Sequence, residues 1–253
     1  MKENIKLKKI YEKTFQKKER VRETDEFREV LTKIKWSGKN ILDVGCGTGE
    51  LAYLIAKKGG NVKGIDYSKN GIDIAKRKYQ HPNLSYELTD VSKQISGEYD
   101  VIISIGTLEH MDRPFLMLKK FKNHLSSNGK IIITSPNWTN TRGLILMTLK
   151  LLFDAPITLA DLHYFTPIDF VKWGQKLDMN LTWKTIEHSW GNGDKLIIDL
   201  KQRLPKIFND MNINDKQQKV NLFLKWINQK VLPIIKSTKE NGAIGIYILS
   251  KKR

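Results

Sequence analysis

The chain has 253 residues, of which 40% are hydrophobic, which suits one large folded α/β domain with modest additions. Its single cysteine, Cys46, excludes an internal disulfide framework, and we expect no metal site. The longest apolar run, residues 143–153, contains a lysine and is too short to span a bilayer. No signal peptide is visible, so we expect a cytoplasmic protein with at most peripheral membrane contact.

The formal net charge of +17 is concentrated at the two ends of the chain. Residues 1–40 carry 13 basic and 7 acidic side chains, and residues 191–253 carry 13 basic and 5 acidic ones. Residues 41–190 are closer to balance, with 18 basic and 15 acidic side chains. Basic flanks suit nucleic acid, an anionic lipid surface or an acidic partner, and they are also typical of a solvated surface. The charge therefore leaves the partner open.

The first two thirds of the chain alternate between predicted strands and helices. Helical spacing over residues 5–34 predicts one or two amphipathic helices, so we expect residues 1–36 to form an N-terminal helical extension. Strands are then predicted at 40–44, 61–66, 84–88, 99–105 and 129–135, and helices at 50–58, 70–79 and 114–125. This rhythm predicts an α/β fold with a doubly wound, mostly parallel sheet that binds ligands beyond the carboxyl ends of its strands.

The rest of the main domain, expected over residues 37–253, is less regular. Residues 136–165 form a variable acceptor-side segment whose apolar middle fits a lid over the acceptor or a helix packed on the sheet. Residues 190–240 are expected to be a helical insertion before the last strand. The predicted elements are a helix from Thr166, which would be its N-cap, a strand at 181–188, helices at 195–209 and 215–235, and a closing strand at 243–250.

A glycine-rich loop, Gly45-Cys46-Gly47-Thr48-Gly49, follows the first predicted strand. Glycines let the backbone turn sharply and approach a ligand closely, which dinucleotide-binding loops also exploit. Here position 50 is glutamate rather than the last glycine of G-x-G-x-x-G, and Asp43 and Glu50 flank the loop. These carboxylates would repel a pyrophosphate and favour a ligand with an ammonium and a sulfonium group. S-adenosylmethionine is such a ligand.

Two more carboxylates follow the next two predicted strands. Asp66 ends the second strand, where a carboxylate can accept hydrogen bonds from both ribose hydroxyls, and Tyr67 follows it. Asp90 lies beyond the third strand, where it can accept from the 6-amino group of adenine. Taken singly, each of these acids has an alternative role: Asp66 could cap a helix, and Asp90 could be a turn residue. Three acids at successive strand ends together indicate an S-adenosylmethionine site.

Residues 40–135 resemble the core of the class I S-adenosylmethionine-dependent methyltransferase superfamily. The resemblance rests on Leu42–Gly49, Gly64–Ser68, Thr89–Val91, Tyr99–Ser104 and Ser104–Pro114, the last of which is similar to ubiquinone-biosynthesis and other small-molecule O-methyltransferases. It implies a Rossmann-like sheet of seven strands with an antiparallel last strand. It assigns Asp43, Gly45 and Gly47 to the methionine end, Asp66 and Tyr67 to the ribose, Asp90 and Val91 to the adenine, and the backbone of Ser104 and Ile105 to the methionine side. We count Cys46 among the cofactor-binding residues because it lies in the same loop, where its side chain fits a small filler rather than a catalytic group.

Two histidines are candidates for the acceptor side. Methyl transfer needs alignment and exclusion of water, and it needs a general base only when the acceptor holds its proton firmly. His110 follows the fourth predicted strand and is the first candidate base; the alternative is a hydrogen bond that ties its loop. His163 is the second, in a stretch similar to one that walls the acceptor pocket in the resembling branch; the alternative is capping of the next helix.

These observations predict a methyltransferase that acts on a small or lipid-like molecule, through O-methylation by in-line transfer. Ser104–Thr107 stands where enzymes that methylate base or glutamine amino groups carry Asp/Asn-Pro-Pro-Tyr/Phe. One alternative is an RNA-directed methyltransferase that uses the basic flanks, although no interleaved aromatic platform for single strands is visible. Another is a non-catalytic scaffold that binds the cofactor, against which the intact acid set argues. The acceptor and the oligomeric state stay open.

Overall fold

The computed structural model describes residues 24–92, 95–158, 161–186, 188–213, 217–235 and 238–252. The part of the predicted N-terminal helices before residue 24 lies outside these ranges. The first described helix, α2 (Asp25–Leu31), falls within the predicted helical region. Thr24 caps it by accepting a hydrogen bond from the Phe27 N–H at 3.1 Å, and Val30 and Leu31 are buried.

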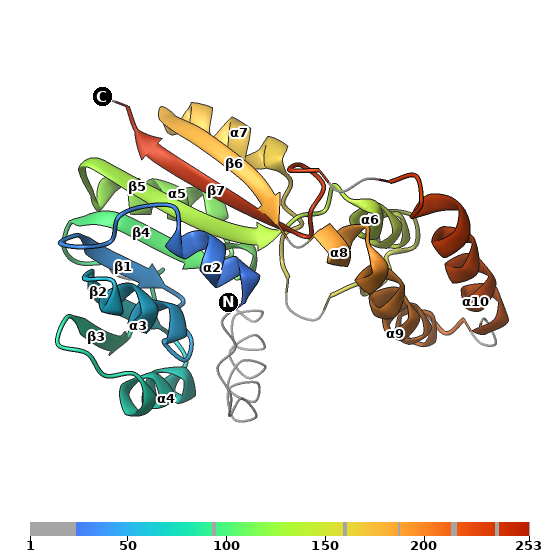
Figure 1. Cartoon of the computed structure of the whole chain (residues 1–253), viewed down its shortest axis with the longest axis horizontal. Coiled ribbons are helices and arrows are strands. Elements are labelled where there is room, and N and C mark those ends of the chain that lie inside the picture. The colour runs from blue at the N-terminus through green and yellow to red at the C-terminus, as the bar shows by residue number, and fades with distance from the viewer. Residues whose placement is uncertain are drawn as a thin grey trace. The chain divides into compact units, whose positions relative to one another are not determined.

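Among the described residues, seven strands form one sheet in the order β3-β2-β1-β4-β5-β7-β6. They are β1 (Asn40–Val44), β2 (Asn61–Asp66), β3 (Leu84–Leu88), β4 (Tyr99–Ile105), β5 (Leu125–Pro136), β6 (Met179–Ile186) and β7 (Ile244–Lys251). Strands β1 to β5 pair in parallel, and the last strand, β7, runs antiparallel (Figure 1). The predicted fold class is confirmed. The apolar runs of β1 and β4 are buried in the sheet, which explains why the sequence pattern located these strands.

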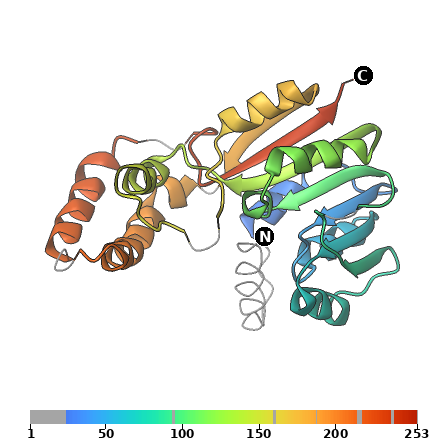
Figure 2. The same cartoon turned by 180° about the vertical axis from the view of Figure 1, so that it is seen from behind.

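Helices cover both faces of the sheet. The strand connections contain α3 (Glu50–Lys57), α4 (Lys69–Lys78) and α5 (Pro114–Asn123), and α7 (Pro167–Lys176) precedes β6. Helices α2 and α3 lie on the face turned to the viewer in Figure 1, and α5 and α7 lie on the face seen in Figure 2. The strand order reverses between β1 and β4, so the loops that follow these two strands border the position where such folds bind ligands.

The chain divides into two compact units. The first contains the chain through Ser135, Ile168–Trp183 and the chain from Ile246 onward, and thus most of the sheet. The second contains Pro136–Pro167 and Lys184–Gly245. Its helical elements are α6 (Thr141–Phe153), α8 (His188–Gly191), α9 (Asp194–Asp210), α10 (Gln217–Trp226) and a π-helical segment, η2 (Ile227–Val231).

The second unit has its own apolar core. Helix α6 contributes Leu146, α9 contributes Leu200, and α10 contributes Leu224 to one buried cluster. The apolar middle of the 136–165 segment is therefore a helix that is buried along one side in this unit. The predicted helix at 215–235 becomes α10 followed by the π-helical η2. None of the described helices is long and apolar enough to cross a membrane.

Candidate active site

The glycine-rich loop joins β1 to α3 and folds back onto the end of β2. The N–H groups of Gly45 and Cys46 both donate to the Ile65 carbonyl, at 2.8 and 3.1 Å. Gly45 and Gly47 adopt φ values of +76° and +54°, in the left-handed region that glycine enters without a steric penalty. The loop is therefore held against β2 by its own backbone.

Asp66 joins this loop to the end of β2. Its carboxylate accepts from the Gly47 N–H at 2.9 Å through one oxygen and from the Ser68 N–H at 2.7 Å through the other. The residue is 7% exposed. Each carboxylate oxygen has two lone pairs, so these bonds leave acceptor capacity for a pair of ribose hydroxyls. Tyr67 is half-buried next to it, and the ribose role of both residues stays a prediction.

Asp43, near the end of β1, is a buried acid of the site. Burial, with Asp66 and Glu50 nearby, raises its carboxyl pKa from 3.8 to about 8. Among the described residues, neither a cation nor a hydrogen-bond donor is among the causes that set the pKa of this carboxyl. A positively charged ligand would relieve this repulsion, since an opposite charge favours the ionised form. The donor set therefore fits a cation such as a sulfonium or ammonium group and does not fit a pyrophosphate.

Cys46 and Tyr86 fill the space beneath the loop. A Cβ built on Gly64 would lie 3.0 Å from the Cys46 sulfur and 2.9 Å from the Tyr86 ring, so both side chains crowd β2. The Tyr86 hydroxyl donates to the Gly49 carbonyl at 3.1 Å. Burial, followed by the nearby Asp43 and Asp66, raises the pKa of the Cys46 thiol well above its usual value. A thiolate is thereby disfavoured, which supports the interpretation of this cysteine as a filler.

Asp90 and Val91 lie in the turn after β3. The Asp90 carboxylate accepts from the N–H and the hydroxyl of Ser92, at 2.9 and 2.6 Å, which is the turn role that the sequence left open. Both bonds use the same oxygen, so the other stays available for an adenine amino group. Lys120 donates to the Val91 carbonyl at 2.8 Å and fixes this turn to α5. The adenine role remains a prediction.

The end of β4 forms the other wall of the loop region. Ser104 is fully buried, and its hydroxyl has no hydrogen-bond partner among the described residues. The half-buried Ile105 accepts the Thr107 hydroxyl through its carbonyl at 3.0 Å. A Cβ on Gly45 would lie 2.5 Å from the Thr107 side chain. The loops after β1 and β4 are therefore in tight contact, and the backbone role of Ser104 and Ile105 toward a ligand stays a prediction.

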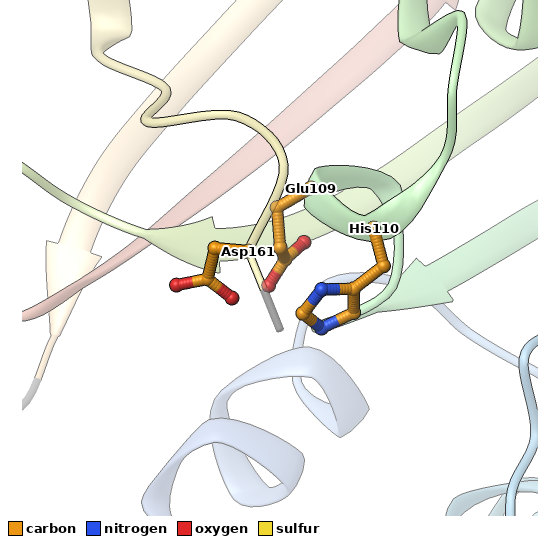
Figure 3. A group of neighbouring side chains, drawn as sticks. All are labelled: Glu109, His110 and Asp161. Carbon is orange, nitrogen blue, oxygen red and sulfur yellow. The ribbon is translucent and has the colours of Figure 1, made fainter. Parts of the chain in front are cut away.

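The two candidate bases belong to different units. His110 lies on the short 3-10 helix η1 (Leu108–His110) after β4, where Figure 3 shows its imidazole beside the carboxylate of the buried Glu109. His163 belongs to the second unit, where its ring stacks on Phe165 with centroids 5.4 Å apart. The position of His110 next to Glu109 fits a general base, and it fits equally a hydrogen bond that stabilises the loop. The catalytic assignment of His110 therefore stays a prediction.

Three residues that shape this site carried no sequence signal of their role. Thr107 restricts Gly45, Tyr86 supports the loop from β3, and Thr134 on β5 accepts the Gly106 N–H through its hydroxyl at 3.0 Å. Each acts on a residue far away in the sequence, and each is a residue type that strands and turns commonly contain. Only the β-sheet register brings them together.

The family comparison gives the same answer as the site geometry. Residues 35–190 match a family model described as a methyltransferase domain. The chain belongs to this methyltransferase family. The resemblance to class I S-adenosylmethionine-dependent methyltransferases, drawn above from sequence motifs, is thereby confirmed. The cofactor that the glycine loop and its acids indicate is the methyl donor of that superfamily.

Among similar methyltransferases, two ubiquinone biosynthesis O-methyltransferases show the extent of the similarity. The protein from Coxiella burnetii (strain RSA 493 / Nine Mile phase I) is 34% identical over 108 residues, which are 41% of this chain and 46% of the relative. The mitochondrial one from Schizosaccharomyces pombe is 30% identical over 132 residues, 50% of this chain and 47% of the relative. This methyltransferase chain thus spans about half the length of the curated relatives it matches.

Solved structures share the fold over most of the chain. The magnesium protoporphyrin IX methyltransferase from Synechocystis PCC 6803, with bound SAH, superposes with a TM-score of 0.57 and 16% identity, over 98% of this chain and 86% of that one. Phosphoethanolamine N-methyltransferase 2 from Haemonchus contortus, in complex with phosphomonomethylethanolamine and S-adenosylhomocysteine, gives a TM-score of 0.56 at 16% identity, over 90% and 52%. At this identity the comparison concerns the fold alone.

Proposed function

We propose that this methyltransferase binds S-adenosylmethionine at the carboxyl ends of β1, β2 and β3 and methylates an oxygen of a small or lipid-like molecule. The observation that carries the proposal is the buried Asp43 beside the glycine loop and the buried Asp66, whose carboxylate holds that loop. Burial, followed by the nearby Asp66 and Glu50, raises the Asp43 carboxyl pKa to about 8. S-adenosylmethionine supplies a methyl group that its sulfonium has already activated. The N–H groups of Gly45, Cys46 and Gly47 are directed at Ile65 and Asp66, so the carboxylates, rather than these three N–H groups, would meet the ligand.

The residues of the chain would divide the work of binding. Asp43 would attract the cationic methionine end, Asp66 would accept the ribose hydroxyls, and Asp90 would accept the adenine amino group. Gly45 and Gly47 leave room for the ligand because they lack side chains. Ser104 and Ile105 would border the methyl group through their backbone.

Oxygen is proposed as the acceptor atom because the relatives at 30–34% identity are named O-methyltransferases. A hydroxyl acceptor holds a proton that must leave as the methyl group arrives, which is the task of a general base. His110, directly after β4, is the first candidate, and His163 of the second unit is the next.

Calorimetry with S-adenosylmethionine tests the proposal directly. The wild-type protein should bind, and Asp66→Ala should weaken binding by about 1–3 kcal/mol, because polar groups of the ligand lose their partner. Asp73→Ala is the matched control: it removes an exposed acid of α4 that pairs with Lys69, so its affinity should equal that of the wild type. Absence of binding by the folded wild-type protein would refute the proposal.

A peripheral membrane contact is part of this proposal, with α10 and η2 as the contact surface. Leu222 and Trp226 are 67% and 55% exposed on α10, whereas Val220 and Leu224 face the core. Residues 217–235 contain three lysines and no acidic residue. Large apolar side chains framed by lysines suit the boundary between lipid headgroups and acyl chains, and the positive charge favours anionic lipid.

Co-sedimentation with vesicles tests this contact. We expect binding to phosphatidylcholine vesicles that contain phosphatidylglycerol, weaker binding at high salt, and little binding to phosphatidylcholine alone. The double variant Leu222→Ser/Trp226→Ser should lose binding. Ile198→Ser, which changes an exposed apolar residue of α9, should keep it. Equal losses in both variants, or none in either, would contradict the assignment to α10.

A further inference from the structure

We infer that Glu26 of α2 is a positioning residue for the cofactor site, acting through Thr134 on the loop that follows β4. This inference rests on the proposed cofactor site. The Thr134 hydroxyl donates its hydrogen bond to the Glu26 carboxylate. The two residues are 108 positions apart, so this bond connects the N-terminal helix to the carboxyl end of β5.

The bond to Glu26 fixes the direction of the Thr134 hydroxyl. A hydroxyl has one hydrogen, and an ionised carboxylate can only accept. With its hydrogen directed at Glu26, the Thr134 oxygen presents its lone pairs to the Gly106 N–H, which donates to it at 3.0 Å. The same N–H also reaches the Thr134 carbonyl at 3.2 Å. Thr134 is fully buried, so no solvent competes for these bonds.

Gly106 opens the loop that reaches the glycine-rich motif. Its φ of +56° turns the chain out of β4, and the next residue, Thr107, bonds back to the Ile105 carbonyl at 3.0 Å. The Thr107 side chain occupies the place where a Cβ of Gly45 would be, within 2.5 Å. A shift of Gly106 would therefore carry Thr107 into or away from Gly45. This contact couples the position of the β4 loop to the shape of the glycine-rich loop.

A simpler role for Glu26 is to stabilise α2 as an acid in its first turn. Asp25 offers the matched comparison, because it lies in the same turn, is exposed and pairs only with Arg28 of its own helix among the contacts described. Replacing either acid removes the same favourable charge from the start of α2. Only the replacement of Glu26 removes the acceptor of the Thr134 hydroxyl.

The test measures S-adenosylmethionine affinity by calorimetry and amide hydrogen exchange of residues 106–111 in the ligand-free protein. Glu26→Ala should weaken binding roughly three- to thirtyfold and speed exchange at Gly106. Glu26→Gln keeps an amide oxygen that can accept the hydrogen bond, so its affinity and exchange rates should be close to those of the wild type. Asp25→Ala should also match the wild type in both measurements. Thr134→Val should reproduce Glu26→Ala. The double variant Glu26→Ala/Thr134→Val should be no weaker than either single one, because both remove the same connection.

Two outcomes would overturn the inference. In one, Glu26→Ala keeps the wild-type affinity and exchange rates; in the other, the effects of the two single variants add fully. The proposed function fails separately, when the folded wild-type protein does not bind S-adenosylmethionine. In that case hydrogen exchange at Gly106 still decides whether Glu26 positions the loop. Should Glu26→Ala unfold, Glu26→Leu, which also removes the acceptor but keeps more of the side-chain volume, gives the same decision when it is compared with Glu26→Gln.

Discussion

Replacing Asp43 by asparagine should stabilise the ligand-free protein at neutral pH while weakening its affinity for a cationic cofactor. The carboxyl pKa of 3.8 in an unfolded chain rises to about 8 in the fold, so folding favours the protonated form. Stability from this group is therefore greatest below pH 3.8 and falls as the pH rises, levelling off above about pH 8. At pH 7 the burial of this group costs up to about 4 kcal/mol, at 1.36 kcal/mol per pKa unit.

Asparagine has nearly the same shape and does not titrate, so the cost should disappear in Asp43→Asn. The assay is urea unfolding of both proteins at several pH values between 4 and 8. The free energy of unfolding of the variant minus that of the wild type should be near zero at the lowest pH. This difference should grow by about 1.4 kcal/mol per pH unit toward pH 7. A difference that does not change with pH would refute the reasoning, because it would mean that Asp43 does not titrate in this range.

The same proton should report on the ligand. With a pKa of about 8, Asp43 is about nine-tenths protonated at pH 7, and a bound cation should expel this proton. Calorimetry of S-adenosylmethionine binding in two buffers of different ionisation enthalpy would count the protons released. We expect nearly one for the wild type and nearly none for any residual binding by Asp43→Asn. Equal numbers of released protons in the wild type and in Asp43→Asn would mean that the positive charge of the ligand does not lie near Asp43.

Three further substitutions separate the binding, folding and chemical roles. Gly45→Ala should weaken S-adenosylmethionine binding by at least about tenfold in calorimetry, since φ is +76° and a Cβ has no room; wild-type affinity would contradict the described loop. Asp199→Asn should cost about 2–3 kcal/mol in urea unfolding, because Asp199 holds Arg142 and Arg203 in the second unit. Burial raises the Asp199 pKa, but the two arginines outweigh burial and hold this pKa below its usual value. The wild type should therefore lose the stabilisation from Asp199 as the pH falls through the lowered pKa, whereas Asp199→Asn should show no such loss. His110→Ala should lower kcat by about 100-fold or more with unchanged cofactor affinity if it is the base, whereas a loss of affinity alone would make it a loop tie.

The sheet could be predicted from the sequence because its signals are local. Strands β1 and β4 are buried on both faces, so their residues form short, nearly continuous apolar runs, and turn residues mark their ends. The predicted cofactor acids follow from the same logic, since Asp43 and Asp66 lie at the ends of β1 and β2, Asp90 lies just beyond β3, and parallel strands end on one edge. The division into two units carried no such signal, because the helical spacing of α6 and α9 shows a buried face without showing what it is buried against.

The parts of the site that escaped prediction depend on register and on the fold's electrostatics. Thr134 faces Ile105 only because β4 and β5 pair in that register, and Glu26 reaches Thr134 only because α2 lies on the sheet. The pKa of Asp43 depends on how completely the loop excludes water, which a motif of glycines and acids does not specify. Motifs therefore identify which ligand a site is built for, while burial and long-range contacts set how strongly it is held.

The acceptor side poses a different problem for sequence reasoning. The predicted cofactor residues all belong to the first unit, where they occur along the chain in the same sequence as the strands that they follow. The candidate acceptor residues belong to both units, with His110 in the first and His163 in the second. The second unit is built from helices whose residues are fixed by packing around Leu146 and Leu200, and packing constrains size and polarity rather than chemistry. Helical spacing in this unit therefore predicts its core and carries no information on the acceptor.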